Sequence, residues 1–429
     1  MFFGTATLNQ KNELTIGGVK INQLIQEHGT PLIVYDVAFI RQRIRAFKQN
    51  FLAMNVKGRV FYASKAFSVL AMYRLLEEEG IGCDVVSGGE IYTAKKAGMS
   101  SEEIEFHGNN KTRDELAYAV EENLGTIVID NFYEIELLKE ILEERNTTQA
   151  VLLRITPGIS AETHDYILTG QTDSKFGFDV ASNQAQQALE QVLSDKRFNV
   201  KGVHCHIGSQ IFSSDGFLAA AQKMMEILTD WREKYGFVSE VLNIGGGFGV
   251  RYTNEDNPLA PEEFVRVIIE KVKELSVHYD YPLPEIWIEP GRSIVAEAGV
   301  TLYEVGAIKR IPNVRTYVSV DGGMGDNLRP ALYQARYEAT LLNRMEEEKE
   351  LVTIAGKYCE SGDILIHDIE LPKLQAKDVL VMGTTGAYGY SMANNYNRNP
   401  RPAVIFVENG ETSVVVARES FADMVKLDK

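Results

Sequence analysis

The chain has 429 residues, of which 24% are charged, and a formal net charge of -16. This length exceeds what one typical core accommodates, so we expect two domains, and the composition is that of a globular protein rather than a disordered one. The acidic balance argues against a general affinity for nucleic acid or anionic membranes, although it leaves room for a locally positive pocket that attracts an acidic ligand.

The beginning of the chain, MFFGTATLNQKNELTI, lacks a basic region followed by a sustained apolar core. No later segment has the roughly eighteen apolar residues that a membrane span needs, so we expect a cytoplasmic protein. The cysteines are Cys83, Cys205 and Cys359. Their odd number and wide spacing fit neither a disulfide framework nor a CxxC metal site.

From about residue 56, short apolar runs alternate with longer helical patterns, which is typical of a parallel sheet built from βα units. The runs are RVFYAS, IGCDVVS, EIEFHG, TIVID, VLLRIT, VKGVHCHIG, VLNIGGG and EIWIEPG. Eight strand-helix units predict a closed eight-stranded α/β barrel of the TIM type. The alternative, an open doubly wound sheet, would normally carry a GxGxxG turn after its first strand, and FYASKAF is no such turn.

The connections between these runs are of two kinds. Most are helical, such as TRDELAYAVEENLG, where Thr112 and Glu115 predict a capping box and Gly125 is expected to end the helix. The stretch ETHDYILTGQTDSKFGFD after the fifth run is instead long and polar, and we expect it to act as a lid.

After about residue 298, short alternating strands such as VRTYVSVDGG, DILIHD, DVLVMGTTGAYG and AVIFVE predict a second, mostly antiparallel β domain. The short strands TIGGVKI and PLIVYD near the beginning of the chain are candidates to join it. We therefore expect a barrel over residues 36–298 and a β domain built from residues 1–35 and 299–429.

In an α/β barrel the active site lies at the C-terminal ends of the strands. The residues expected there are unusually polar: Lys65, Ser87, His107, Asp130, Arg154, His206, Gly245, Gly246, Gly247 and Glu289. Lys65 ends an apolar run, so it is either a lysine whose ammonium reaches solvent or one retained for chemistry.

Two further motifs belong to this group. GGGFG follows the seventh strand, where such barrels hold phosphate, and its bare amides can approach phosphate oxygens; the alternative is a tight strand-helix turn. Glu289 in EPGR is either a partner for a pyridine nitrogen or half of an ion pair with Arg154 or Arg292.

A strand-end lysine, a phosphate cradle and a buried acid are the three protein groups that pyridoxal phosphate requires. Lys65 would bond the cofactor covalently, the glycine amides would bind its phosphate, and Glu289 would keep the ring nitrogen protonated. His206 could stack on the ring, and Ser209 could assist the phosphate. His204 and His206 share a strand face, but no HExxH motif or carboxylate triad accompanies them, so we expect no metal.

The motifs FYASKAF, HCHIGSQ, GGGFG, EPGR, RPALY, CESGD and GAYG follow one another from about residue 30 to 400. In this order and spacing the chain resembles the diaminopimelate decarboxylase family, which has the alanine-racemase-like fold type of pyridoxal phosphate enzymes. The resemblance implies removal of carbon dioxide from the D-centre of meso-2,6-diaminopimelate to give L-lysine, the last step of lysine biosynthesis.

The resemblance also implies roles for residues outside the barrel motifs. Arg292 and Arg329 would bind the substrate's distal carboxylate, and Glu360 would accept a hydrogen bond from its distal ammonium. Cys359 would return a proton to the carbon that loses carbon dioxide, reaching the site from the neighbouring subunit of a homodimer. The remaining cofactor and substrate contacts implied are Gly291, Arg292, Tyr333 and Tyr388.

Three alternatives remain on the sequence alone. A decarboxylase of ornithine or arginine would share most of the motifs but would have no reason for an arginine at Arg329. A racemase would need two acid/base groups at one carbon and would have no use for CESGD beside RPALY. A non-catalytic homologue that binds a partner protein, as antizyme inhibitor does, predicts loss of the lysine, the cysteine or the phosphate loop, and all three are present.

Overall fold

The computed structural model describes residues 2–159 and 174–429. The chain forms two compact units: unit 1 consists of Met1–Arg43, Val250–Asn257 and Arg292–Lys429, and unit 2 consists of Ile44–Gly249 and Pro258–Gly291. Most of the segment that we expected to act as a lid falls within residues 160–173 and so lies outside the described residues.

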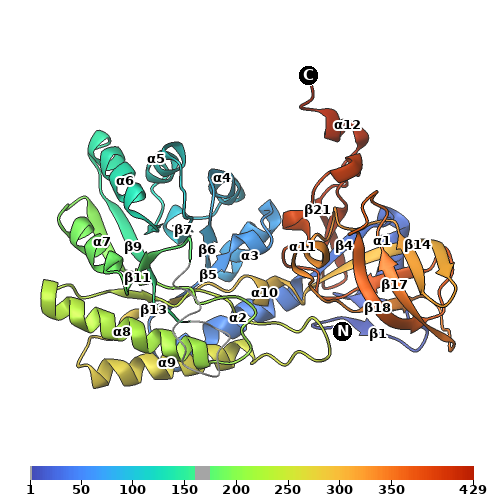
Figure 1. The fold of residues 1–429 in the computed structure, drawn as a ribbon, viewed down its shortest axis with the longest axis horizontal. Coiled ribbons are helices and arrows are strands. Elements are labelled where there is room, and N and C mark those ends of the chain that lie inside the picture. Colours follow the sequence, from blue (N-terminus) through green and yellow to red (C-terminus); the bar gives the residue numbers. More distant parts are fainter. Residues whose placement is uncertain (1, 160–173) are drawn as a thin grey trace. The chain divides into compact units, whose positions relative to one another are not determined.

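Unit 2 contains a closed barrel of eight parallel strands (Figure 1). The strands are β5 (Gly58–Ala63), β6 (Gly82–Val85), β7 (Ile104–Phe106), β8 (Thr126–Ile129), β9 (Gln149–Thr156), β11 (Phe198–His204), β12 (Val241–Asn243) and β13 (Glu285–Ile288). They pair in the order β9-β11-β12-β13-β5-β6-β7-β8, and the β8–β9 pairing closes the ring. The short strand β10 (Phe178–Asp179) adds to β9. Each strand coincides with one of the eight predicted apolar runs, which confirms the barrel against the open sheet.

Helices cover the outside of the barrel (Figure 1). They are α2 (Val37–Ala53), α3 (Leu70–Glu79), α4 (Gly88–Ala97), α5 (Arg113–Glu121), α6 (Phe132–Glu144), α7 (Gln184–Leu193), α8 (Asp215–Tyr235) and α9 (Pro261–His278). The strands are largely apolar because the barrel core covers one side of them and the helices cover the other. Phe61, Val128, Leu152, Val241 and Trp287, contributed by five different strands, form one buried cluster.

The beginning of α5 confirms a local prediction, and its end corrects another. The Thr112 hydroxyl accepts from the Glu115 amide, and the Glu115 carboxylate accepts from the Thr112 amide, which completes the capping box. The helix ends at Glu121, however, well before Gly125. Gly125 serves close packing instead, because a Cβ there would lie 2.3 Å from the carbonyl oxygen of Glu102.

Unit 1 is built on a mostly antiparallel sheet. Its strands are β4 (Leu32–Asp36), β14 (Gly299–Ile311), β15 (Arg315–Val320), β16 (Ala339–Leu342), β17 (Lys349–Ala355), β18 (Ile364–Pro372), β19 (Val379–Met382), β20 (Ala403–Glu408) and β21 (Glu411–Val416). The order is β18-β17-β15-β14-β4-β20-β21, and β19 pairs with both β14 and β16. Four short helices belong to this unit: α1 (Ile21–His28), α10 (Arg292–Val295), α11 (Arg329–Tyr333) and α12 (Phe421–Val425).

The first residues of the chain join unit 1 in two ways. PLIVYD supplies β4, which lies between β14 and β20 in the sheet. TIGGVKI is not one strand but a hairpin in which β2 (Leu14–Ile16) pairs with β3 (Val19–Lys20), and β1 (Thr7–Leu8) pairs with β2. Gly17 and Gly18 both have positive φ, of 58° and 80°, which a two-residue hairpin turn requires.

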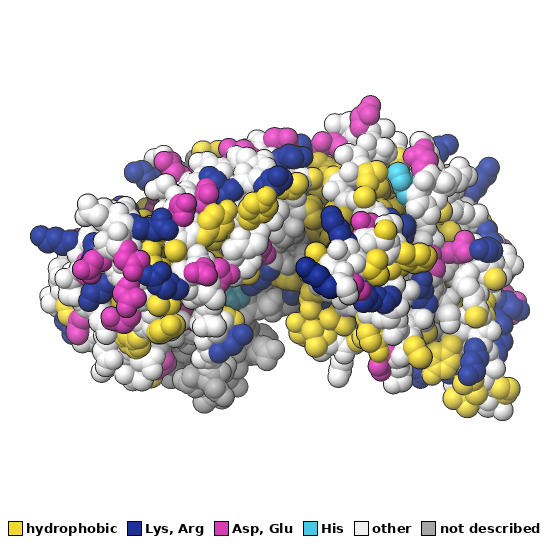
Figure 2. All heavy atoms as spheres, turned by 90° about the horizontal axis from the view of Figure 1, so that it is seen from above, with side chains coloured by type: hydrophobic (Ala, Val, Ile, Leu, Met, Phe, Trp, Pro, Cys, Tyr) yellow, Lys and Arg dark blue, Asp and Glu magenta, His cyan; other side chains and the backbone are white. Residues whose placement is uncertain are grey.

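Charged side chains of both signs are interspersed on the face shown in Figure 2. Exposed ion pairs elsewhere in the described structure include Arg336–Glu255 and Lys377–Glu304. Among the described residues, no helix combines the length and the apolar character needed to cross a membrane.

Candidate active site

Lys65 projects from a fixed backbone at the C-terminal end of β5. The strand passes directly into a 3₁₀ turn, Ser64–Ala66, and Lys65 is exposed although Ala66 and Phe67 are completely buried. The Tyr62 hydroxyl donates to the carbonyl of Phe67 over 3.1 Å, which ties the turn to the strand. Burial on both sides of Lys65 therefore holds its backbone in place while its side chain remains accessible.

The loop after β12 has no room for side chains, and two of its amides already have partners. The Gly245 amide donates to Oδ1 of Asn243 over 2.8 Å, and the Gly246 amide donates to Nδ1 of His206 over 3.3 Å. Gly245 and Gly247 have φ of 72° and 108°, in the region that favours glycine. A Cβ on Gly246 would lie 2.0 Å from the Glu289 carbonyl oxygen, and one on Gly247 would lie 2.3 Å from that of Gly208. Any side chain in this loop would strain the turn or clash with the neighbouring loops, so the absence of side chains is a structural requirement.

Phe248 anchors this glycine loop to the helices outside the barrel. Its ring is buried and stacks on Phe217 of α8, with the ring centroids 4.9 Å apart. It also contacts Phe264 of α9 at 5.3 Å and Phe47 of α2 at 5.2 Å. Three helices thus fix the loop through one aromatic side chain, a role that the apolar residue in GGGFG did not suggest by itself.

Glu289 lies buried at the end of β13 and is surrounded by polar side chains. Its Oε2 is 3.1 Å from Nε2 of His204, and its Oε1 accepts from Nδ2 of Asn243 at 2.7 Å and is 3.2 Å from Nε2 of His107. The sequence placed His107 at the correct strand end but gave it no role, and it missed Asn243 altogether. NIGGG contained a signal, since an asparagine that ends a buried strand needs a polar partner.

The alternative role for Glu289 was an ion pair with Arg154 or Arg292. Both arginines form other contacts. Arg154 lies 3.5 Å from Asp130 and stacks over the ring of Phe176 at 4.4 Å. Asp130 in turn accepts from the Gly177 amide at 3.0 Å. Asp130 and Arg154 therefore hold the segment at Phe176 and Gly177 in place.

The charges in this cluster follow from burial and from close contacts. Burial alone would raise the pKa of Glu289, but the adjacent His204 and His107 hold it well below its usual value. Burial alone would lower the pKa of His107, but Asp84 and Glu289 raise it from 6.5 to about 10. For His204 burial prevails over Glu289 and lowers the pKa to about 4. At neutral pH the cluster thus contains a carboxylate, an imidazolium and a neutral imidazole.

We expect His107 to make the stability of the apoprotein depend on pH. The pKa of His107 is 6.5 in the unfolded chain and about 10 in the folded one. Its contribution to the free energy of unfolding is therefore complete below pH 6.5 and is lost as the pH increases toward 10. The free energy of unfolding from urea denaturation should fall by roughly 2 kcal/mol between about pH 7 and 8.5. His107→Gln should remove this decrease, and an unchanged slope in the variant would contradict the assignment.

The barrel core contains further acids that the sequence did not single out. Asp84 on β6 and Glu105 on β7 are buried, and each has an oxygen without a hydrogen-bond partner among the described residues. Burial raises the pKa of Glu105 to about 7. Donor atoms of His107, His204 and Glu289 lie within 4.8 Å of one another, a spacing that a metal ion could use, whereas the sequence had paired His204 with His206. Their mutual contacts identify them as a hydrogen-bonded network around Glu289.

The other predicted cofactor contacts of unit 2 lie around the same strand ends. His206 follows β11, and the Gly246 amide is 3.3 Å from its Nδ1. Burial and then the charge of Lys65 lower the pKa of His206 well below 6.5, so its ring is neutral. Gly291 packs against the end of β5, where a Cβ would lie 2.8 Å from that of Ala63. Ser209 is exposed.

In unit 1, Arg292 and Arg329 both contact Tyr252, a residue that the sequence did not indicate. Nη1 of Arg292 donates to the Tyr252 hydroxyl over 2.6 Å, and its guanidinium lies 4.8 Å from the centre of the Tyr388 ring. The Arg329 guanidinium lies 4.6 Å from the centre of the Tyr252 ring and donates to the Tyr337 hydroxyl. Arg329 is only 7% exposed, so it is not a surface arginine.

The remaining predicted residues of unit 1 are exposed. Tyr333 ends α11 and is 62% exposed. Cys359 and Glu360 are exposed on the loop between β17 and β18. The side-chain oxygen of Asn397 accepts from the Cys359 amide at 2.8 Å and so holds the base of this loop.

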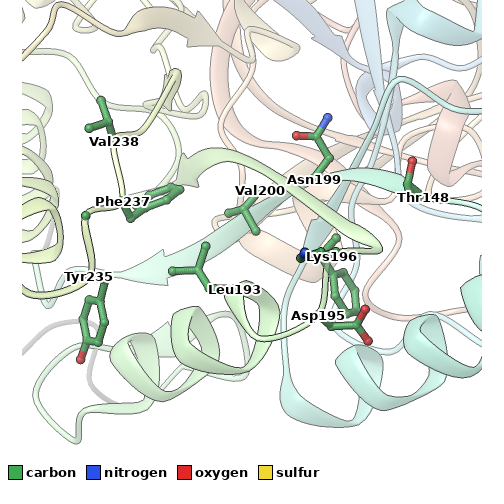
Figure 3. A pocket seen from close by; sticks show the side chains of 11 residues that line it. Thr148, Leu193, Asp195, Lys196, Asn199, Val200, Tyr235, Phe237 and Val238 are labelled. Carbon is green, nitrogen blue, oxygen red and sulfur yellow. The ribbon is translucent and has the colours of Figure 1, made fainter.

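A cavity of about 570 Å³ lies elsewhere on the barrel (Figure 3). Its lining includes Thr148, Asp195, Phe198 and Phe237, which lie where strands β9, β11 and β12 begin rather than where they end. Chemistry in α/β barrels takes place at the opposite ends of the strands, so this cavity is not the active site.

Comparison with known proteins defines first a class and then a family. Residues 37–296 match the family described as "Pyridoxal-dependent decarboxylase, pyridoxal binding domain". The chain is 59% identical to diaminopimelate decarboxylase of Bacillus subtilis (strain 168) over 426 residues, which cover 99% of this chain and 97% of that protein. The crystal structure of diaminopimelate decarboxylase from M. jannaschii superposes with a TM-score of 0.92 at 36% identity, covering 99% of this chain and 98% of that one. A further structure of that enzyme, with the same TM-score and identity, contains L-lysine.

The fold and the matched domain are thus those of a pyridoxal-dependent decarboxylase. Within that class, the chain belongs to the diaminopimelate decarboxylase family.

Proposed function

We propose that this chain uses pyridoxal phosphate to remove carbon dioxide from the D-centre of meso-2,6-diaminopimelate and releases L-lysine. The observation that carries the proposal is the grouping at one end of the barrel. An accessible lysine, a loop that cannot hold side chains and a buried carboxylate all lie at the C-terminal ends of the strands. These groups fit the aldehyde, the phosphate and the ring nitrogen of the cofactor.

Each group of the barrel has a role that its surroundings support. Lys65 would bond the cofactor covalently, and the amides of Gly245–Gly247 would bind its phosphate. When bound, the cofactor supplies an electron sink for the pair left by departing carbon dioxide. Glu289 would hold a proton on the ring nitrogen, because its neighbours keep it a carboxylate although it is buried. His206, with a neutral ring, would pack on the cofactor, and Ser209 and Gly291 would complete the contacts.

Unit 1 would bind the part of the substrate that does not react. Arg292 and Arg329 would donate to the carboxylate of the L-centre, and Glu360 would accept from the ammonium there. Arg329 supports this role, since it is a buried cation whose side-chain contacts among the described residues are with Tyr252 and Tyr337 rather than with a carboxylate. A buried charge without a counterion favours an anionic ligand. Tyr333 and Tyr388 would complete the substrate contacts, Tyr388 also touching the cofactor.

Cys359 would donate a proton to the carbon that has lost carbon dioxide. A thiol suits this step because it carries a proton that it can transfer to carbon. The exposure of Cys359 supports the further proposal that it acts in the site of a second copy of the chain, which makes the enzyme a homodimer with shared sites. A reduced thiol also supports function in the cytoplasm, where cysteines stay reduced.

The proposal is tested by measuring carbon dioxide release by the purified protein with added pyridoxal phosphate. Meso-diaminopimelate, L-lysine and L-ornithine are compared at equal concentrations. Release from diaminopimelate alone is expected. Release from ornithine or lysine instead would leave the cofactor assignment intact and overturn the substrate assignment.

A further inference from the structure

Tyr252 contacts both predicted carboxylate-binding arginines, and it does so with two different parts of its side chain. Its hydroxyl accepts from Arg292 over 2.6 Å. The centre of its ring lies 4.6 Å from the Arg329 guanidinium and 5.7 Å from that of Arg292. An accepting hydroxyl fixes one guanidinium through a directional bond, and the ring face attracts the other through its quadrupole.

The ring of Tyr252 is itself held in place. It meets the buried Tyr337 edge to face, at 5.4 Å between centroids and an angle of 85° between planes. The Tyr252 and Thr253 amides both donate to one oxygen of Asp256, at 2.9 and 2.8 Å, which fixes the turn that bears the side chain. Tyr252 is therefore an ordered support rather than a flexible surface tyrosine.

Two guanidinium groups that contact the same side chain repel each other, and an anion that lies near both offsets this repulsion. Both guanidinium groups contact the same side chain, Tyr252, which ties the positions of Arg292 and Arg329 to each other. A carboxylate has two oxygens and accepts several hydrogen bonds, so it fits a pair of guanidinium groups better than any neutral group does.

We propose that Tyr252 is a positioning residue that holds Arg292 and Arg329 for the retained carboxylate of the substrate, and thereby sets selectivity for substrates with a second carboxylate. This inference rests on the proposed function, because it takes from it the ligand of the two arginines. Tyr252 acts through the arginines and takes no part in the bond-breaking step.

The experiment compares two ligands that differ only in that carboxylate. L-Lysine retains it, and cadaverine, the corresponding diamine, lacks it. Binding of each to the holoenzyme is followed by the change in cofactor absorption, for the wild type, Tyr252→Phe and Tyr252→Leu. Tyr317→Phe is the matched control, because Tyr317 is a half-buried tyrosine of the same unit whose ring also faces an arginine, Arg315, at 6.0 Å.

Tyr252→Phe, which loses only the hydroxyl, should weaken L-lysine binding on the order of tenfold and change cadaverine binding less than about twofold. Tyr252→Leu, which also loses the ring, should weaken L-lysine binding further, and the KM for diaminopimelate should rise more than kcat falls. Equal effects on both ligands, or none, would overturn the inference while leaving the proposed function in place. A wild-type enzyme that releases no carbon dioxide from diaminopimelate would overturn both.

Discussion

Lys65→Ala is expected to slow carbon dioxide release from meso-diaminopimelate by at least about a thousand-fold, because alanine has no amine to bond the cofactor or to expel the product. The fold should be unaffected, since the side chain is exposed and the turn is held by the buried Ala66 and Phe67. The rate is measured with saturating cofactor, and the bound cofactor is followed by its absorption, which should lose the band of the covalent form.

The same strand supplies the control. Lys57 is exposed and directly precedes β5, so Lys57→Ala removes a lysine at the opposite end of that strand. It should keep the wild-type rate. If Lys65→Ala retained more than about a tenth of the activity, the covalent role of Lys65 would have to be abandoned.

Glu289→Gln should lower the rate on the order of a hundred-fold, because a neutral amide of nearly the same shape cannot hold a proton on the ring nitrogen. The substitution also leaves His107 without its nearest anionic partner, at 3.2 Å, so the variant should be less stable than the wild type at neutral pH. Activity and the midpoint of urea unfolding are both measured, so that lost charge and lost stability can be separated.

Glu285→Gln is the matched control for this prediction, since Glu285 begins β13 at the end of the strand opposite Glu289. It should change neither activity nor the unfolding midpoint appreciably. A Glu289→Gln enzyme that works within about twofold of the wild type would show that the buried carboxylate does not control the ring nitrogen.

The barrel was predictable because its signal is repeated. Eight apolar runs predict eight strands, and the absence of a GxGxxG turn after the first of them favoured the barrel over the open sheet. Local signals were less certain. In one helix the capping box predicted at Thr112 is confirmed, but the helix ends at Glu121, earlier than predicted. Gly125 was expected to end the helix. A glycine is needed there instead because a Cβ would lie 2.3 Å from the carbonyl oxygen of Glu102, a residue in a different loop.

The candidate active-site residues also differ in how readily the sequence indicates them. Lys65, the glycine loop and Glu289 could be proposed from the sequence because each follows or ends a strand and has a residue type that suits one part of the cofactor. Asn243 and Tyr252 could not, because their importance comes from what they touch. A tyrosine in VRYTNED has no sequence signal for a contact with Arg329, which lies 77 positions further along the chain. Only the fold brings them together.

The polar centre of the barrel has a consequence for how related chains diverge. Asp84, Glu105 and His204 each have a buried atom without a hydrogen-bond partner among the described residues. Well-packed apolar side chains of similar volume at these positions and at His107 would stabilise the barrel more. Random substitution under selection for folding alone would therefore drift toward leucine, isoleucine and methionine at these positions. A duplicated copy that had lost its chemistry should show that drift here first, before its glycine loop or its surface changed.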